Sequence, residues 1–216
     1  MSEFISFLNH RLKKELPGPE AQFRMSPPRT ESKYRTPASD AKKAAVMVLF
    51  YYKDQDLTFV IIERSASHPR DKHGGQLSLP GGKYEDTDID LAHCALRETQ
   101  EEIGIMATDI RLIGALTPIY VFVSNFAVSP YIGFLDSRPT FLPQPSEVSA
   151  ILEVSIVNVF HPSSKGIKRV QAHDLLIPNM PYYDLEGKTL WGATAMVLSE
   201  VEALYTEFLA VVGNRD

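Results

Sequence analysis

Three glutamates and an arginine lie close together near the middle of the chain, in the run RETQEEIGI at residues 97–105. If this run is helical, Glu98 lies three and four residues before Glu101 and Glu102, so the three carboxylates share one helix face. Carboxylates this close repel one another unless a cation lies between them. Oxygen ligands suit a hard ion such as Mg²⁺ or Mn²⁺ rather than zinc. The spacing therefore indicates a divalent-metal site, the alternative being a solvated acidic face.

The residues before the glutamates favour the metal site over the solvated face. We expect a helix from about residue 89 to 103, with one apolar stripe that begins at Ile89 and a second apolar side, around Cys94, that continues into the glutamates. Such a helix is covered on both sides, and a carboxylate cluster on a covered face is costly unless it is neutralised. The glycines Gly81 and Gly82 precede the helix, where backbone can approach a ligand closely.

This stretch resembles the Nudix box of the Nudix hydrolases, whose pattern is a glycine, five residues, an acid, seven residues, then Arg-Glu-apolar-x-Glu-Glu-x-Gly-apolar. The matching positions are Gly82, Arg97, Glu98, Glu101, Glu102, Gly104 and Ile105. The resemblance implies metal ligands at Glu98, Glu101, Glu102 and the Gly81 carbonyl. It also implies that Arg97 pairs with the glutamates and orients them, since Glu101 follows it by four residues.

The run departs from the Nudix pattern at three places. Asp88 stands where the pattern has glutamate, eight residues rather than seven separate it from Arg97, and Thr99 occupies an apolar position. The longer spacing leaves the role of Asp88 open, and we expect it to cap the helix.

Two further residues near the box are candidates for the chemistry. Glu98 or Glu101 is placed to deprotonate a water, but in several Nudix branches an acid on a downstream loop does so, and Glu147 is the candidate here. Its alternative is a solvated loop side chain. Lys83, beside the glycines, is a candidate for pairing with substrate phosphate, the alternative being a surface lysine.

A second resemblance lies upstream of the box and points to the coenzyme A pyrophosphatase branch of the Nudix family. Arg64-Ser65 and the run KHGGQLSLPGG at 72–82 are similar to its signature, which is Arg-Ser, a basic loop and Gly-x-Val-x-Phe-Pro-Gly-Gly. The branch implies that coenzyme A or its thioesters are split into 3′,5′-ADP and a 4′-phosphopantetheine product. It also implies substrate contacts from Arg64, Lys72 and His73, although the loop after Arg64 is longer than the pattern.

Two other functions stay open at this point. One is a Nudix hydrolase of ADP-ribose, NADH or another nucleoside diphosphate derivative. The other is a non-catalytic, ligand-sensing Nudix domain, against which the complete glutamate set argues.

The composition limits the partners of this 216-residue chain. Its net charge of −5 gives no electrostatic basis for general nucleic-acid binding. Its single cysteine, Cys94, excludes an intramolecular disulfide and is expected in the core. We find neither an 18-residue apolar run nor a secretory signal at the start, so we expect a cytoplasmic protein with no membrane contact. The expected partner is a small-molecule nucleoside diphosphate substrate; the oligomeric state is open, a homodimer included.

The rest of the sequence supplies the elements that position these residues. We expect a helix and a proline-containing arm at 1–43, packed on a Nudix domain at 44–216. The arm, residues 17–42, is expected to be irregular, and the segment Thr117–Asn125 is expected to line a site. Alternating and β-branched runs predict strands at 44–52, 57–63, 76–79, 110–116, 126–134 and 148–154, a short helical element from 154 to 160, two more strands around the turn at 185–188, and a closing helix at 194–212. This order predicts an α+β fold with a mixed sheet between helices, and the resemblance implies the α/β/α Nudix sandwich.

Overall fold

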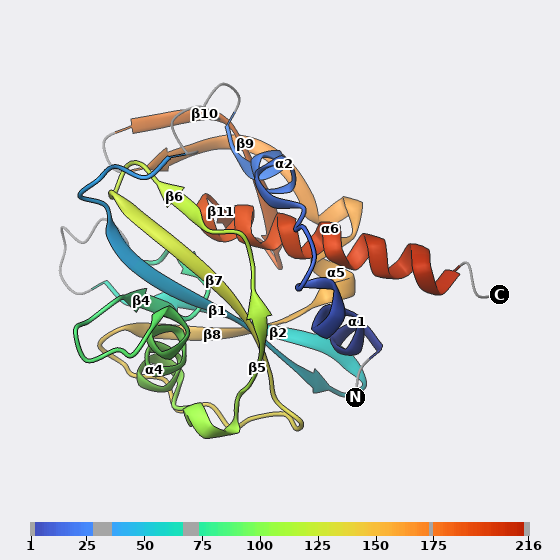
Figure 1. Ribbon diagram of the computed structural model, residues 1–216. Helices are drawn as coiled ribbons and strands as arrows, with labels where there is room; N and C mark the ends of the chain where they lie inside the picture. Colours follow the sequence, from blue (N-terminus) through green and yellow to red (C-terminus); the bar gives the residue numbers. More distant parts are fainter. Residues whose placement is uncertain (1–2, 28–35, 67–73, 173–174, 214–216) are drawn as a thin grey trace.

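The computed structural model describes residues 3–27, 36–66, 74–172 and 175–213 (Figure 1). The helices are α1 (Glu3–Arg11), α2 (Gly18–Gln22), α4 (Leu91–Ile103), α5 (Ile156–Phe160) and α6 (Ala193–Gly213), with single 3₁₀ turns η1 (Phe23–Met25), η2 (Ala107–Asp109) and η3 (Pro162–Ser164). The strands are β1 (Lys42–Lys53), β2 (Asp56–Arg64), β3 (Leu77–Ser78), β4 (Gly81–Lys83), β5 (Arg111–Ala115), β6 (Ile119–Val121), β7 (Phe126–Phe134), β8 (Val148–Ser155), β9 (Lys165–Ala172), β10 (Leu175–Leu185) and β11 (Lys188–Trp191).

The main sheet is mixed, as the sequence predicts. Its strand order is β3-β2-β1-β7-β5, and β4, β6 and β8 pair with β1, β7 and β2. The central pair β1 and β7 runs parallel, whereas every other pairing in this sheet is antiparallel. A second sheet of three antiparallel strands has the order β11-β10-β9.

Side chains of β1 alternate between two hydrophobic cores because successive residues of a strand face opposite sides of the sheet. Met47 and Leu49 belong to the core beneath α4, together with Cys94. Val48 and Phe50 belong to the opposite core, which contains the buried side chains of α1 and α6. Helix α4 therefore covers one face of the sheet while α1 and α6 cover the other (Figure 1), which is the expected α/β/α arrangement.

The N-terminal helix contributes directly to the second core. Phe4, Ile5 and Leu8 are fully buried, and the Phe4 ring meets the rings of Phe50 and Tyr205 edge-on, with centroids 6.2 and 5.2 Å apart. Aromatic pairs in this geometry add stability beyond their buried area.

Several local predictions were wrong. The segment 17–42 contains α2 and η1 rather than only irregular chain, and β4, β6 and β9 are strands that the pattern did not predict. The box helix begins at Leu91, and Ile89 is 83% exposed instead of belonging to a covered stripe. The helix expected at the start of the chain is α1, and Ser2, the residue before it and a candidate for its N-cap, lies outside the described residues.

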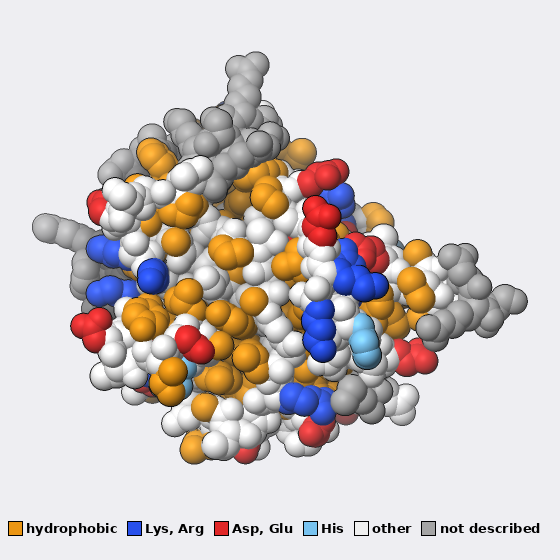
Figure 2. All heavy atoms as spheres, in the orientation of Figure 1, with side chains coloured by type: hydrophobic (Ala, Val, Ile, Leu, Met, Phe, Trp, Pro, Cys, Tyr) orange, Lys and Arg blue, Asp and Glu red, His pale blue; other side chains and the backbone are white. Residues whose placement is uncertain are grey.

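The surface seen in Figure 2 carries acidic and basic side chains side by side around a central hydrophobic area. The described residues of this face form no extended basic patch. No helix in the described part of the chain is both long and apolar enough to cross a membrane.

Candidate active site

Helix α4 is capped at both ends by residues outside its apolar pattern. The carboxylate of Asp90 accepts a hydrogen bond from the His93 backbone N–H at 2.8 Å, which is the N-cap interaction. Gly104 ends the helix in the left-handed conformation, with φ of 73°, and its N–H donates to the Gln100 carbonyl. The prediction that Asp88 caps this helix was therefore wrong.

Asp88 is instead the buried partner of Arg97. Arg97 Nε and one terminal nitrogen donate to the two Asp88 oxygens at 2.9 and 3.0 Å, a bidentate pair. The Glu85 backbone N–H donates to the same carboxylate at 2.9 Å. The bond from Arg97 is the main reason that the pKa of Asp88 lies well below its usual range, and Asp88 in turn raises the pKa of Arg97.

Arg97 joins this buried carboxylate to two glutamates of the box. Its Nη1 lies 3.0 Å from an oxygen of Glu98 and 3.0 Å from an oxygen of Glu101. Its other terminal nitrogen also donates to the Lys83 carbonyl at 3.1 Å. One guanidinium thus sets the side-chain direction of two carboxylates and ties them to the strand that carries the glycines.

Glu102 lies deeper, on the buried side of the helix, and is 1% exposed. The Gly81 N–H donates to its Oε2 at 2.8 Å, and the Arg64 guanidinium lies 3.5 Å from its Oε1. Burial raises the pKa of Glu102 to about 7, the Gly81 and Arg64 contacts opposing this rise and the charges of Glu98 and Glu147 adding to it.

Gly82 lies against the Glu98 carboxylate. A Cβ at position 82 would be 2.4 Å from the Glu98 carboxyl carbon, so only glycine leaves room for this side chain. Burial is the main cause of the raised pKa of Glu98, and the charges of Glu101 and Glu147 raise it further.

Glu147 is exposed, and its charge acts on both Glu98 and Glu102. Its carbonyl accepts a hydrogen bond from the Ser65 N–H at 2.8 Å, and the Ser65 hydroxyl donates to the Pro145 carbonyl at 2.9 Å. The downstream loop is therefore held beside the end of β2, near the box glutamates.

The donor set suits a divalent cation, although no ready-made site is present. Among the described residues, no group of three or more His, Cys, Asp or Glu side chains is already arranged to hold a metal ion. The available donors are carboxylate oxygens, the ligands that Mg²⁺ and Mn²⁺ prefer. Burial is the main cause of the raised pKa values of Glu98 and Glu102, and repulsion from neighbouring glutamates adds to it, while Arg97 forms ion pairs with Glu98 and Glu101. The chemistry of these donors therefore fits such an ion, with Arg97 holding Glu98 and Glu101 at one side of the cluster.

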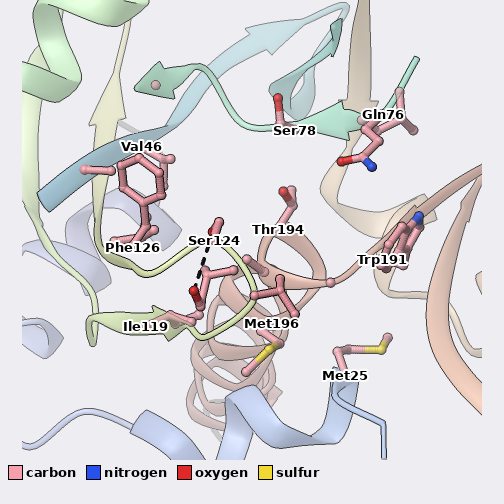
Figure 3. A pocket seen from close by; sticks show the side chains of 18 of the residues that line it. Met25, Val46, Gln76, Ser78, Ile119, Ser124, Phe126, Trp191, Thr194 and Met196 are labelled. Atoms are coloured by element: carbon pink, nitrogen blue, oxygen red, sulfur yellow. Dashed lines mark hydrogen bonds between the residues drawn. The ribbon is translucent and has the colours of Figure 1, made fainter. Parts of the chain in front are cut away.

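A cavity of about 470 Å³ opens beside the glycines. Its polar lining includes Arg64, Lys83, Gly81 and Gly82, the residues next to the carboxylates. The rest is mainly apolar and comes from segments far apart in the sequence (Figure 3), with Met25, Val46, Ile119, Phe126, Trp191 and Met196 among the side chains. A volume of this size matches small-molecule sites.

The structure brings together most of the residues that the sequence singled out. Arg64 and Lys83 line the cavity, whereas Lys72 and His73 lie outside the described residues. The segment Thr117–Asn125, which we expect to line a site, contributes four residues to the lining of the cavity: Ile119, Val121, Val123 and Ser124. Sequence reasoning missed the Asp88–Arg97 pair, although the displaced acid in the box pattern was a signal for it.

Cys94 is buried, as expected, with its sulfur 3.7 Å from the Gly82 carbonyl. Burial raises the pKa of its thiol to about 11, so it is not a nucleophile at neutral pH.

Comparison with known proteins agrees with this geometry. The family model described as the NUDIX domain matches residues 41–166, more than half of the chain. A curated relative from Salmonella paratyphi B, the uncharacterized Nudix hydrolase NudL, is 30% identical over 165 residues, which cover 74% of this chain and 81% of the relative. The chain belongs to the Nudix family.

Solved structures show the same fold at low sequence identity. A MutT/nudix family protein from Enterococcus faecalis is 15% identical with a TM-score of 0.54, over 99% of this chain and 80% of that chain. The MutT protein from Methanosarcina mazei is 14% identical with a TM-score of 0.50, over 76% of this chain and 94% of that chain. At this identity the likeness shows the fold alone.

Proposed function

We propose that this chain is a metal-dependent diphosphate hydrolase that cleaves coenzyme A or its thioesters into 3′,5′-ADP and a 4′-phosphopantetheine product. The observation that carries the proposal is the position of the carboxylates. Glu98 lies against Gly82 and Glu102 accepts from Gly81, while both glycines line a 470 Å³ cavity that also contains Arg64 and Lys83. A diphosphate between the glycines and the two cations would lie beside the metal ligands.

Glu98, Glu101 and Glu102 are the proposed ligands of Mg²⁺ or Mn²⁺, with the Gly81 carbonyl as a further one. A bound divalent ion would withdraw charge from the diphosphate and lower the pKa of a water. The Arg97 guanidinium orients Glu98 and Glu101, and it stays in place because its other edge is fixed on buried Asp88.

The general base is one of two kinds of carboxylate. Glu98 and Glu101 are on the helix itself, whereas Glu147 reaches the same cluster from the loop after residue 143. Glu147 has the better access to a water because it is exposed and forms no salt bridge within the part of the chain that the structure describes. We assign it as the leading candidate for the base or for an additional ligand.

Substrate contacts are assigned to Arg64, Lys83, Lys72 and His73. Arg64 and Lys83 suit the phosphate groups, since charge-assisted hydrogen bonds to phosphate are strong. The apolar part of the cavity suits the pantetheine arm and an attached acyl chain, which are less polar than the ribose that lies beyond the diphosphate in ADP-ribose. ADP-ribose or NADH remains the second candidate substrate class, supported by the same diphosphate site.

A substrate panel tests the proposal. Coenzyme A, an acyl-coenzyme A, ADP-ribose and NADH are each incubated with the purified chain and Mg²⁺ or Mn²⁺, and products are resolved by mass. We expect 3′,5′-ADP from both coenzyme A compounds, and no product when EDTA replaces the ion. Faster turnover of ADP-ribose or NADH would assign the other substrate class, and no turnover of any diphosphate would leave a ligand-sensing domain.

A further inference from the structure

Glu200, on α6, is a buried carboxylate with no part in the proposed chemistry. It is 0% exposed, and its recorded partners in the described chain are four neutral hydrogen-bond donors rather than a cation. Burying a carboxylate is costly even when it is hydrogen-bonded, and an apolar side chain would fill this space more cheaply. A charge in this position therefore calls for an explanation beyond packing.

The four donors come from two segments that are distant in sequence. From α2, the Gly18 N–H donates at 3.0 Å and the Gln22 side-chain amide at 3.0 Å. From the turn between β5 and β6, the Thr117 hydroxyl donates at 2.6 Å and its N–H at 3.2 Å. Gln22 also donates to the Thr117 carbonyl at 2.8 Å, so the two segments are joined to each other as well as to Glu200.

Each of these segments continues into a wall of the cavity. Three residues after Gln22, Met25 lines it, and two residues after Thr117, Ile119 lines it. Met196, one helical turn before Glu200 on α6, lines it from a third side. Figure 3 shows Met25, Ile119 and Met196 on neighbouring walls of the same space.

We propose that Glu200 is a positioning residue that fixes the distance between these three walls and thereby the fit of the substrate group beyond the diphosphate. The acidic side chain suits this role because one carboxylate accepts several donors at once, and each hydrogen bond to a charged group is stronger than a neutral one. An apolar side chain at position 200 would make no directional contact with either segment. The inference rests on the proposed hydrolase only for its kinetic readout.

The test compares Glu200→Gln with Glu207→Gln. Both residues are on α6, but Glu207 pairs with Arg11 of α1 and not with a cavity wall. The first readout needs no substrate: Trp191, the only tryptophan of the chain, lines the cavity, so acrylamide quenching of its fluorescence reports access to the cavity. The second readout is KM and kcat for coenzyme A with Mg²⁺.

We expect Glu200→Gln to increase the quenching of Trp191 and to raise KM by about tenfold or more, while kcat stays close to that of the unchanged protein. In glutamine an NH₂ group replaces one of the two carboxylate oxygens. This group is a donor and cannot accept either of the two hydrogen bonds that the replaced oxygen accepts from its neighbours. Glu207→Gln should leave quenching and KM unchanged. If the coenzyme A assignment fails, the unchanged protein does not turn over coenzyme A, but the quenching comparison still decides the role of Glu200.

Thr117→Val and Thr117→Ser provide a second pair in case Glu200→Gln does not fold. The valine removes one donor to Glu200, whereas the serine keeps it. We expect increased quenching and a raised KM for the valine variant and recovery of both values with serine. Unchanged quenching and unchanged KM in Thr117→Val, or in a folded Glu200→Gln that has only a lower Tm, would overturn the proposal and leave a purely structural carboxylate.

Discussion

At the scale of single residues, the site depends on Arg97, whose guanidinium is fixed by the buried Asp88 carboxylate on the side away from the glutamates. Arg97 is 17% exposed, and the Asp88 carboxylate that fixes it is fully buried. Two parallel hydrogen bonds to Asp88 fix the plane of the guanidinium, and its remaining nitrogen faces Glu98 and Glu101. This explains how the extra residue in the box is tolerated: the acid still reaches the arginine, from a loop rather than from the helix.

Changing Asp88 to Asn should therefore affect both stability and activity. Removing one partner of a buried ion pair costs about 3–5 kcal/mol, because the other charge is left without compensation. We expect a lower Tm and a lower kcat, since Arg97 no longer holds Glu98 and Glu101. Asp86→Asn, two residues earlier and exposed, is the control. Equal melting of the two variants would show that the pair contributes no stability.

The box glutamates give a second prediction. Glu101→Gln and Glu102→Gln keep the side-chain size and remove one negative charge from the proposed ligand set. We expect folded proteins whose metal-dependent turnover falls by orders of magnitude, measured at saturating Mg²⁺. Glu85→Gln, an exposed carboxylate outside the cluster, should keep its activity. Near wild-type turnover in Glu102→Gln would remove that residue from the metal site.

The pKa of Glu102 leads to a prediction for the metal-free protein. Burial raises this pKa from 4.5 to about 7, so the folded state holds the proton more tightly than the unfolded state. The resulting stabilisation is complete below about pH 4.5 and is lost as pH rises through 7. Its size is on the order of 2–4 kcal/mol. In EDTA, the free energy of unfolding of the unchanged protein should fall more steeply over this range than that of Glu102→Gln; parallel curves would contradict the shift.

At the scale of elements, prediction from sequence succeeded where the residues of one segment are enough to determine its secondary structure. Strand β7 has the predicted bounds, and α6 differs from its predicted range by one residue at each end. In both cases the pattern of apolar residues within the segment is enough to predict the element. The short strands β4 and β6 have three residues each, and β1 and β7 provide their pairing, so their own residues carry little signal. Sequence found the box glutamates, but not the contact of Gly81 with Glu102, which depends on that pairing.

The β4 strand allows a test of how the element holds the helix. In Gly82→Ala, the added methyl group would meet the Glu98 carboxylate, the movable end of a side chain, rather than backbone. We expect the fold to survive with a small change in Tm. We expect kcat to fall, because the added methyl group displaces the Glu98 carboxylate from its position beside Glu101. Gly213→Ala, where the space around the added carbon is open, is the control. Unchanged kcat in Gly82→Ala would show that Glu98 has more room than the structure gives it.

At the scale of the whole molecule, separate layers serve separate parts of the proposed substrate. The α4 face of the sheet provides the carboxylates, whereas the cavity is lined by strands of the main sheet together with η1, the second sheet and the start of α6. The glycines of β4 are the point where the two meet, since Gly81 contacts Glu102 and also lines the cavity. In the proposed function, the carboxylates and the group beyond the diphosphate thus depend largely on different elements, so we expect changes in the apolar part of the cavity to alter substrate choice without altering the carboxylates.

This separation leads to a prediction about the 3′-phosphate of coenzyme A, which adds about one and a half to two negative charges at neutral pH. A chain with a net charge of −5 needs a local basic site for that group. Arg64, at the cavity, and Lys72, from the run that resembles the coenzyme A signature, are the proposed site. We expect a higher kcat/KM for coenzyme A than for dephospho-coenzyme A, with a gap that shrinks when Lys72 or Arg64 is neutralised.

The loss of one charged hydrogen bond sets the expected size of this effect. A hydrogen bond to a charged group contributes about 1.5–3 kcal/mol, so Lys72→Gln should reduce the preference for coenzyme A by about tenfold or more. Arg64→Gln should do the same and also lower kcat on both compounds, because Arg64 lies 3.5 Å from Glu102. Lys13→Gln, outside the cavity lining, should change neither value. Equal kcat/KM for the two coenzymes in the unchanged protein would refute the coenzyme A assignment, while the glutamate cluster and its diphosphate chemistry would be unaffected.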